Sequence, residues 1–269
     1  MISKITGGAT ERIFSSVILN KYEVDFFKCL ETGFIQTEDP YWLEEAYSSA
    51  ITKLDVGLAS RNEALRSKTI KVINEYFDSS KKFLDYAGGY GLFTRMMRDQ
   101  GFDFFHTDRY CTNIFANYFT LADSGSDQFE LITSFESFEH FANPLEEISL
   151  ILRHGDNLLF TTELQPKQLN CVTDWWYFIP ETGQHISFYT IESLQYLANS
   201  FGLNFYTDGR SLHLFTKKSL PANLFEREVV YPWHISVMKR KIDRFMRKAS
   251  DTKTSLLQND WQKIKDSLS

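Results

Sequence analysis

A group of glycines lies between two acidic residues in the middle of this 269-residue chain. The stretch from Asp85 to Gly91 reads D-Y-A-G-G-Y-G, and Asp108 follows a short aromatic segment further on. Glycine permits positive φ angles and allows a ligand to lie directly against the backbone. A carboxylate such as that of Asp108 can accept hydrogen bonds from the hydroxyl groups of a ribose. The pattern therefore predicts a nucleotide-type cofactor site with contacts from Asp85, Ala87, Gly88, Gly89, Gly91 and Asp108.

Two histidines lie in segments where acid–base chemistry is expected. His140 belongs to an E-H pair that precedes Pro144, and His185 lies in an aromatic segment with Trp175 and Tyr177. Histidine titrates close to neutral pH, so it can take a proton from a hydroxyl group. We expect His185 to be the catalytic base, with His140 as the second candidate; a structural role for His140 fits the sequence equally well. The segment is too aromatic for a solvent loop, and Trp175 and Tyr177 are therefore expected to bind the substrate.

The surrounding residues predict the elements that hold these groups in place. Residues 82–84 predict a buried strand, and residues 92–100 have the apolar spacing of a helix closed by Gly101. Residues 102–105 predict the next strand, with Asp108 just beyond it. A helix that begins after a glycine turn presents unpaired N–H groups to an anionic ligand.

Short apolar runs further along the chain predict the rest of a sheet. Residues 129–132 and 158–162 predict buried strands, and a weaker strand is expected near residues 118–121. Residues 203–217 predict two strands around an Asp-Gly turn, which would form a terminal hairpin. Strands that alternate with helices in this way indicate an α/β fold with a mostly parallel sheet.

Three stretches together resemble the class I S-adenosylmethionine-dependent methyltransferases. They are the glycine stretch with Asp108, the sequence E-H-x-x-x-P that begins at Glu139, and the sequence W-W-Y…G-Q-H that ends at His185. The resemblance covers residues 22–217 and is greatest to bacterial enzymes of glycan and sugar biosynthesis, related to the sugar C-methyltransferases. It implies an α/β, Rossmann-like fold: a mostly parallel seven-stranded sheet with helices on both faces and a terminal antiparallel hairpin.

The resemblance also implies a function. S-adenosylmethionine is the expected cofactor, with the segment at Phe135 and Glu136 beside its methionine part, and a sugar or glycan-biosynthesis intermediate is the expected methyl acceptor. The sequence leaves open whether oxygen, nitrogen or carbon accepts the methyl group. The alternatives are a catalytically inactive S-adenosylmethionine-binding protein and an NAD-dependent oxidoreductase. The oxidoreductase is disfavoured because Thr94 occupies the position of the third glycine in G-x-G-x-x-G.

The chain departs from the family pattern at two places. Ala87 stands where the first glycine of D-x-G-x-G-x-G is usual, and we therefore expect no positive φ angle there. Sugar C-methyltransferases commonly carry a zinc module with C-x-x-C-G, whereas only Cys29 precedes Gly33 here. One thiolate cannot complete a tetrahedral site, and the His, Asp and Glu residues show no metal-ligand spacing. We therefore expect a metal-independent reaction without metal ligands.

The chain divides into three expected regions. Residues 1–58 are expected to form an N-terminal cap, which could be the degenerate remnant of a zinc module. Residues 59–218 are expected to form the S-adenosylmethionine-binding methyltransferase domain, and residues 219–269 a C-terminal helical extension. The basic, amphipathic pattern at residues 239–248 suits either packing on the domain or weak contact with a membrane surface.

Composition limits the partners and the compartment. Hydrophobic residues make up 43% of the chain and aromatic residues 16%, which indicates a folded protein. The net charge of −6 argues against nucleic acid as a partner and favours a small-molecule or glycan substrate. The sequence shows no apolar run of transmembrane length and no signal peptide, and its three cysteines make no disulfide framework. These features indicate a cytoplasmic location.

Overall fold

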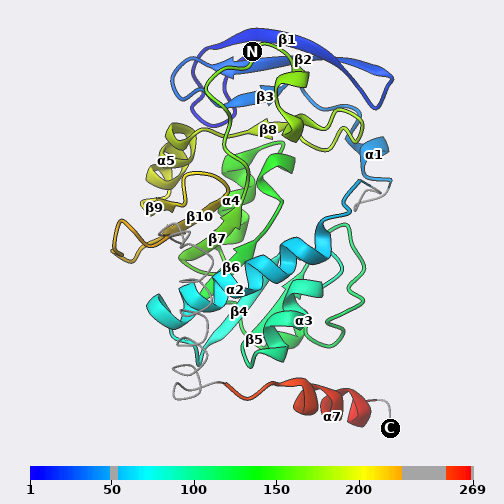
Figure 1. Cartoon of the computed structure of the whole chain (residues 1–269), viewed down its shortest axis with the longest axis vertical. Helices are drawn as coiled ribbons and strands as arrows, with labels where there is room; N and C mark the ends of the chain where they lie inside the picture. Colours follow the sequence, from blue (N-terminus) through cyan, green and yellow to red (C-terminus); the bar gives the residue numbers. More distant parts are fainter. Residues whose placement is uncertain (49–53, 226–252, 268–269) are drawn as a thin grey trace, which may run out of the picture.

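The computed structural model describes residues 1–48, 54–225 and 253–267 of the chain. These residues form two sheets that lie one above the other along the long axis of the molecule (Figure 1). The larger sheet has six strands and the smaller one has four. The predicted α/β fold is confirmed, and the glycine stretch follows a strand of the larger sheet.

The larger sheet is parallel except at one end. Its strands, in spatial order, are β5 (Asp103–Thr107), β4 (Lys82–Tyr86), β6 (Leu131–Ser134), β7 (Asn157–Thr161), β10 (Leu212–Thr216) and β9 (Asn204–Thr207). β10 pairs antiparallel with both of its neighbours, so the predicted terminal hairpin is present. The chain passes from β4 to β5 on one side and returns to β6 on the other. Ligands bind in the crevice at such a reversal of strand order.

The sheet has six strands where seven were expected, because the segment at residues 118–121 forms only one bridge to β5. Thr120 pairs in parallel with His106. The His106 amide donates to the carbonyl of Phe119, and the Leu121 amide donates to the carbonyl of His106, each at 2.8 Å. The connection from β5 to this bridge carries no helix. A parallel crossover needs a dozen or more residues, so this short connection leaves little chain for a full strand.

Helices cover both faces of the larger sheet, because successive strand residues point to opposite sides. These helices are α2 (Leu58–Tyr76), α3 (Leu92–Asp99), α4 (Pro144–Leu152) and α5 (Ile191–Ser200). Phe83 and Leu131 pack in one core with residues of α2 and α3. Leu84 and Ile132 pack in a second core with residues of α4 and α5. The 3-10 helices are η1 (Ala122–Ser124), η2 (Phe138–His140), η3 (Val172–Asp174) and η4 (Trp176–Phe178).

The smaller sheet, which we call the cap sheet, is antiparallel and draws on two distant parts of the sequence. Its strands, in order, are β1 (Thr10–Ile18), β2 (Tyr22–Cys29), β3 (Ile35–Thr37) and β8 (Ser187–Phe188). The first three strands come from the N-terminal region, whereas β8 comes from the aromatic segment. Near the short helix α1 (Leu43–Ala46), the indole of Trp42 donates to the carbonyl of Gly183 at 2.8 Å. The Thr190 hydroxyl likewise donates to the carbonyl of Thr32 at 2.6 Å.

The C-terminal extension is described only in part. The basic stretch at residues 239–248 lies outside the described residues. Helix α7 (Leu257–Ser267) is described, and Figure 1 shows it at the end of the molecule opposite the cap sheet. Within the described ranges, no helix combines the length and the apolar character needed to cross a membrane.

Helix α7 is joined to the larger sheet by a buried ion pair. Arg98 of α3 donates two hydrogen bonds of 2.8 Å to the carboxylate of Asp260, which is only 4% exposed. Arg98 also donates to Asp103 at 2.7 Å, and its guanidinium lies 3.8 Å from the centre of the Phe119 ring. Buried ions of this kind are tolerated because each is paired.

Replacing Asp260 with alanine should lower the free energy of unfolding by about 3 kcal/mol, because the Arg98 guanidinium then stays buried with Asp103 as its remaining acid. Chemical denaturation followed by circular dichroism measures this change. Asp266→Ala removes an exposed acid from the same helix and should change the free energy by less than about 0.5 kcal/mol. Equal stability of the two variants would show that the ion pair does not hold α7 in place.

Candidate functional site

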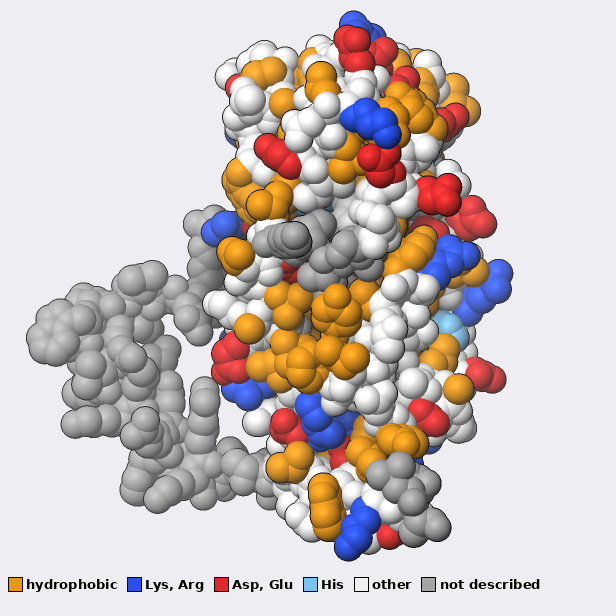
Figure 2. All heavy atoms as spheres, turned by 90° about the vertical axis from the view of Figure 1, so that its right-hand side faces the viewer, with side chains coloured by type: hydrophobic (Ala, Val, Ile, Leu, Met, Phe, Trp, Pro, Cys, Tyr) orange, Lys and Arg blue, Asp and Glu red, His pale blue; other side chains and the backbone are white. Residues whose placement is uncertain are grey.

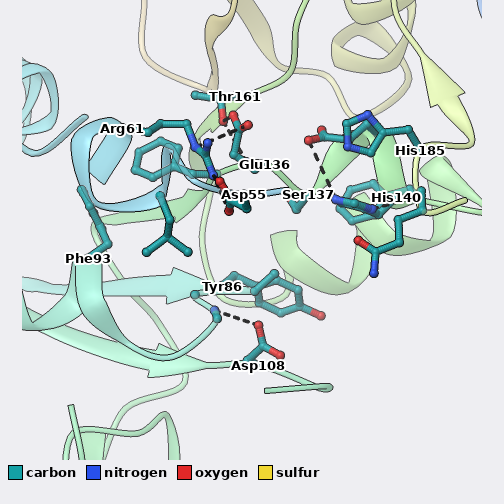
Figure 3. Close-up of a pocket in the computed structure, with 18 of the residues that line it drawn as sticks. Asp55, Arg61, Tyr86, Phe93, Asp108, Glu136, Ser137, His140, Thr161 and His185 are labelled. Carbon is teal, nitrogen blue, oxygen red and sulfur yellow. Dashed lines mark hydrogen bonds and ion pairs between the residues drawn. The ribbon is translucent and has the colours of Figure 1, made fainter. Parts of the chain in front are cut away.

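A cleft of about 940 Å³ lies where the carboxyl ends of β4, β5 and β6 face the cap sheet. Its walls also include the start of α2 and residues 176–185. The predicted site residues that line it are Asp85, Ala87, Gly88, Gly89, Asp108, Phe135, Glu136, His140, Tyr177 and His185. Two predicted residues, Gly91 and Trp175, do not line it. Figure 3 shows this cavity, with Asp108 at one end and the two histidines at the other.

The glycine stretch turns sharply between β4 and α3. Ala87, Gly89 and Gly91 have φ angles of 57°, 57° and 82°. The expectation that Ala87 has no positive φ is therefore wrong: the alanine adopts the left-handed conformation, which costs a non-glycine residue about 1–2 kcal/mol. A Cβ atom on Gly88 would lie 2.4 Å from the nearest carboxylate oxygen of Asp85. Glycine is needed at position 88 because the loop packs directly on this acid.

Asp85 supports the loop from within the sheet. The side chain is buried, and its carboxylate accepts hydrogen bonds from the hydroxyls of Thr94 at 3.0 Å and Thr133 at 2.9 Å. Burial raises the pKa of Asp85 above its ordinary value. Thr94, the residue that departs from the NAD fingerprint, thus joins the first turn of α3 to this acid. Asp85 therefore positions the glycine stretch.

Asp108 closes the other side of the loop. One carboxylate oxygen accepts a hydrogen bond from the Gly89 amide at 2.9 Å. The second oxygen accepts from the amides of Tyr110 and Cys111, each at 2.7 Å. A carboxylate has about four lone-pair directions, so these three bonds leave acceptor capacity for a ligand. Figure 3 shows Asp108 facing the lower part of the cavity, near Tyr86.

A charged network that the sequence did not predict lies between the two ends of the cleft (Figure 3). Glu136 has a left-handed φ of 53°, and its carboxylate accepts a hydrogen bond of 2.8 Å from the Thr161 hydroxyl. Arg61 lies 3.5 Å from Glu136 and 2.9 Å from Asp55. The other predicted residue of this segment, Phe135, packs edge-on against Phe93 at 4.9 Å between ring centres. The close spacing of Asp55 and Arg61 around the start of α2 is the feature of the sequence that could have indicated this ion pair.

His140 and His185 face each other, with their ring centres 5.0 Å apart. Nδ1 of His140 donates to the carbonyl of Gln184 at 3.0 Å, and Nδ1 of His185 donates to the carbonyl of Tyr177 at 2.6 Å. Each ring therefore carries its free lone pair on Nε2. Burial lowers the pKa of His140 to about 4 and that of His185 to about 3. Both imidazoles are therefore neutral at pH 7, and each is a weaker base than an ordinary histidine, contrary to the expectation that they titrate close to neutral pH.

Glu139 lies beside the two histidines. Its carboxylate is fully buried, and neither oxygen makes a well-formed hydrogen bond in the part of the chain that the structure describes; the Tyr177 hydroxyl is near enough to lower its pKa. Burial raises the pKa of Glu139, and the nearby Glu136 raises it further. One ligand atom from each of Glu139, His140 and His185 can be chosen so that all three lie within 4.8 Å of one another. The spacing in the sequence did not reveal this group, and the expectation of a metal-independent reaction stays a prediction.

The aromatic segment is divided between the core and the cleft. Trp175 is 8% exposed, packs against Phe178 and Phe188 in the cap and does not line the cleft, so its contact with substrate stays a prediction that this packing does not support. Its neighbour Trp176 is 66% exposed and lines the cleft. Tyr177 lines the cleft as expected, and its hydroxyl is buried without a hydrogen-bond partner among the described residues. Trp175 has extended backbone between η3 and η4, and successive residues of an extended chain point to opposite sides, which residue type alone does not reveal.

Exposed hydrophobic side chains lie beside the cleft. The connection after β5 exposes Tyr110, Ile114, Phe115 and Tyr118. Tyr110 also lines the cleft, where its ring stacks on Tyr47 at 4.9 Å between ring centres. Figure 2 shows hydrophobic side chains gathered on one face of the molecule. Of these four residues, only Tyr110 lines the cleft.

Three solved methyltransferases illustrate the structural similarity. Mitomycin 7-O-methyltransferase MmcR is 13% identical with a TM-score of 0.38, over 56% of this chain and 53% of that chain. Human N-acetylserotonin methyltransferase, solved with S-adenosylmethionine, is 13% identical with a TM-score of 0.37, over 59% of this chain and 55% of that chain. The plantazolicin methyltransferase BpumL, solved with S-adenosylhomocysteine, is 11% identical with a TM-score of 0.41, over 65% of this chain and 94% of that chain. The chain thus spans about half of the first two proteins, and the likeness concerns the fold alone.

Sequence comparison identifies the family. No curated protein matches the chain. A family model described as a methyltransferase domain matches residues 58–207 of the 269. The matched region contains the glycine stretch, Asp108, the E-H pair and the segment that carries His185. The chain therefore belongs to the family of S-adenosylmethionine-dependent methyltransferases.

Proposed function

We propose that S-adenosylmethionine lies along the glycine stretch and that its methyl group passes to a small molecule bound at the histidine end of the cleft. The observation that carries this proposal is the bond between Asp108 and the Gly89 amide. It places an acid with spare acceptor capacity directly beside bare loop backbone, an arrangement that suits a ribose and the adenine next to it. Glu136, farther along the cleft, is an acceptor for the ammonium group of the methionine part.

The proposed acceptor is a sugar or a glycan-biosynthesis intermediate. Trp176 is exposed at the wall of the cleft and offers a flat apolar surface on which a sugar ring can pack. Glu163, Asp208 and Arg210 line the same cleft and offer charged hydrogen-bonding groups. A ring that is apolar on its face and carries hydroxyls on its edge matches both features.

The chemistry is a displacement at carbon. The acceptor atom forms a bond to the methyl carbon while the carbon–sulfur bond breaks, and the electron pair of that bond remains on sulfur. If the acceptor is a hydroxyl, its proton must also leave. His185 and His140 are the proposed catalytic residues, because both line the cleft and both keep a free lone pair on Nε2. Correct placement of the two reactants supplies much of the rate acceleration.

Asp108→Ala should weaken S-adenosylmethionine binding about 10- to 100-fold, because a charged hydrogen bond is worth roughly 1.5–3 kcal/mol and 1.4 kcal/mol corresponds to a factor of ten. Calorimetric titration measures the affinity. Asp127→Ala, which removes an acid that does not line this cleft, should bind the cofactor like the wild type. Equal affinities in all three proteins, or binding of NAD instead, would contradict the assignment.

His185→Ala should lower kcat by about 10²–10⁴-fold while S-adenosylmethionine affinity stays unchanged, because the imidazole contacts the acceptor. Turnover is followed with methyl-labelled cofactor, after a screen of sugar and glycan intermediates has identified an acceptor. His154→Ala serves as the matched control, since His154 does not line the cleft, and should retain full turnover. Persistent turnover in the His185 variant with a lowered melting temperature would make this histidine structural.

A further inference from the structure

The three side chains at the acceptor end of the cleft are arranged as metal ligands. One nitrogen from His140, one nitrogen from His185 and one oxygen of Glu139 lie within 4.8 Å of one another. The Oε1 atom of Glu139 is 3.9 Å from Nε2 of His140. Ligand atoms about 2.0–2.2 Å from a common ion lie at most about twice that distance apart, so small side-chain rotations bring all three into contact with one ion.

The hydrogen bonds around the histidines fix the tautomer that a metal requires. Each Nδ1 donates to a backbone carbonyl, that of Gln184 for His140 and that of Tyr177 for His185. Metal-ligating histidines almost always donate their second ring N–H in this way, which orients the ring and raises its basicity. The lone pairs on Nε2 are therefore held ready for a ligand.

The buried carboxylate of Glu139 is an independent indication that an ion binds here. Buried polar groups are nearly always hydrogen-bonded, and an unpaired one costs about 1–3 kcal/mol. Both oxygens of Glu139 are fully buried in the wall of the cleft. The Tyr177 hydroxyl is near enough to lower the pKa of this carboxyl, but among the described residues neither oxygen makes a well-formed hydrogen bond. An ion between this carboxylate and the two imidazoles would satisfy it.

We propose that Glu139, His140 and His185 together bind one divalent transition-metal ion. Two imidazoles and one carboxylate suit Zn²⁺, Mn²⁺, Fe²⁺ or Co²⁺, and three protein ligands leave coordination positions open for a substrate. The proposal that an ion binds here rests on these three residues and does not depend on the proposed function. Its role rests on the proposed function. With the Nε2 lone pairs bound to the ion, the two imidazoles would act as ligands and not as bases. The ion would hold the hydroxyl of the acceptor and lower its pKa, so that the proton passes to water in the cleft before methyl transfer.

Ion binding is tested on the full chain after treatment with a chelator. The protein is titrated with Mn²⁺ while the free ion is measured by electron paramagnetic resonance, and Zn²⁺ is then added as a competitor. We expect one ion per chain, displaced by Zn²⁺. Glu139→Gln and His140→Ala should each weaken Mn²⁺ binding about 100-fold or more. His154→Ala should bind like the wild type.

Two further measurements keep the test decisive. The thermal unfolding transition of each variant shows whether it is folded. If an alanine variant is unfolded, Glu139→Gln, which keeps the shape of the side chain, still tests the site. Co²⁺ added to the wild type should give visible ligand-field absorption that His185→Ala alters. Absence of a stoichiometric site in the wild type, or equal affinity in the folded variants, would overturn the metal site.

The metal site and the proposed function can fail separately. One ion bound to a protein that binds no S-adenosylmethionine would support the site and refute the function. Methyl transfer that continues at full rate after chelation, in a protein that takes up no Mn²⁺, would support the function and refute the site. If both hold, the chelated enzyme should lose turnover, keep its affinity for S-adenosylmethionine and recover when the ion is restored.

Discussion

The amide of Ile186 donates a hydrogen bond of 2.8 Å to the carbonyl of Glu139, and the imidazole of His140 donates one of 3.0 Å to the carbonyl of Gln184. These bonds join the segment that leads into β8 to the turn that follows β6. Because β8 also pairs with β3, the same segment is part of the cap sheet. His185 lies between the two bonded residues, so the position of its ring is set by backbone pairing. The acceptor end of the cleft therefore depends on the contact between the two sheets.

The two ends of the cleft are built in different ways. The cofactor end comes from one continuous strand–turn–helix–strand unit, whereas the acceptor end combines three separate parts of the chain. Arg61 lies between Asp55 and Glu136 in the middle. Burial is the main cause that raises the pKa of Glu139, Glu136 adds to it, and Arg61 counteracts it. The arginine thus reduces the repulsion between two acids that lie close together in a poorly solvated place.

The sequence predicted the strand, turn and helix around the glycine stretch because their geometry is local. Glycine, acid and apolar spacing within a few turns of chain suffice to define a strand, a turn and a helix. The left-handed Ala87 was missed because its residue type favours the opposite conformation. The reduced third strand was expected to be weak, and its replacement by one bridge reflects the shortness of the connection.

The acceptor end was predicted only as separate residues. His140 and His185 could each be identified as candidates from their neighbours, but their meeting with Glu139 depends on the pairing of β8 with β3. No spacing in the sequence encodes that pairing, because a two-residue strand has too little pattern to reveal its partner.

The partners of the Arg98–Asp260 ion pair are 162 residues apart in the sequence. The pair can therefore form only late in synthesis, after the larger sheet has been made. Apart from the bridge at Thr120, no strand pairs with the outer side of β5 among the described residues. Lys263 of α7 lies 4.8 Å from the centre of the Phe119 ring, beside that bridge. While the protein is being synthesised, the larger sheet is complete before α7 exists. The nascent chain therefore displays an unprotected strand edge, open to association with other chains, until the last helix arrives to shield it.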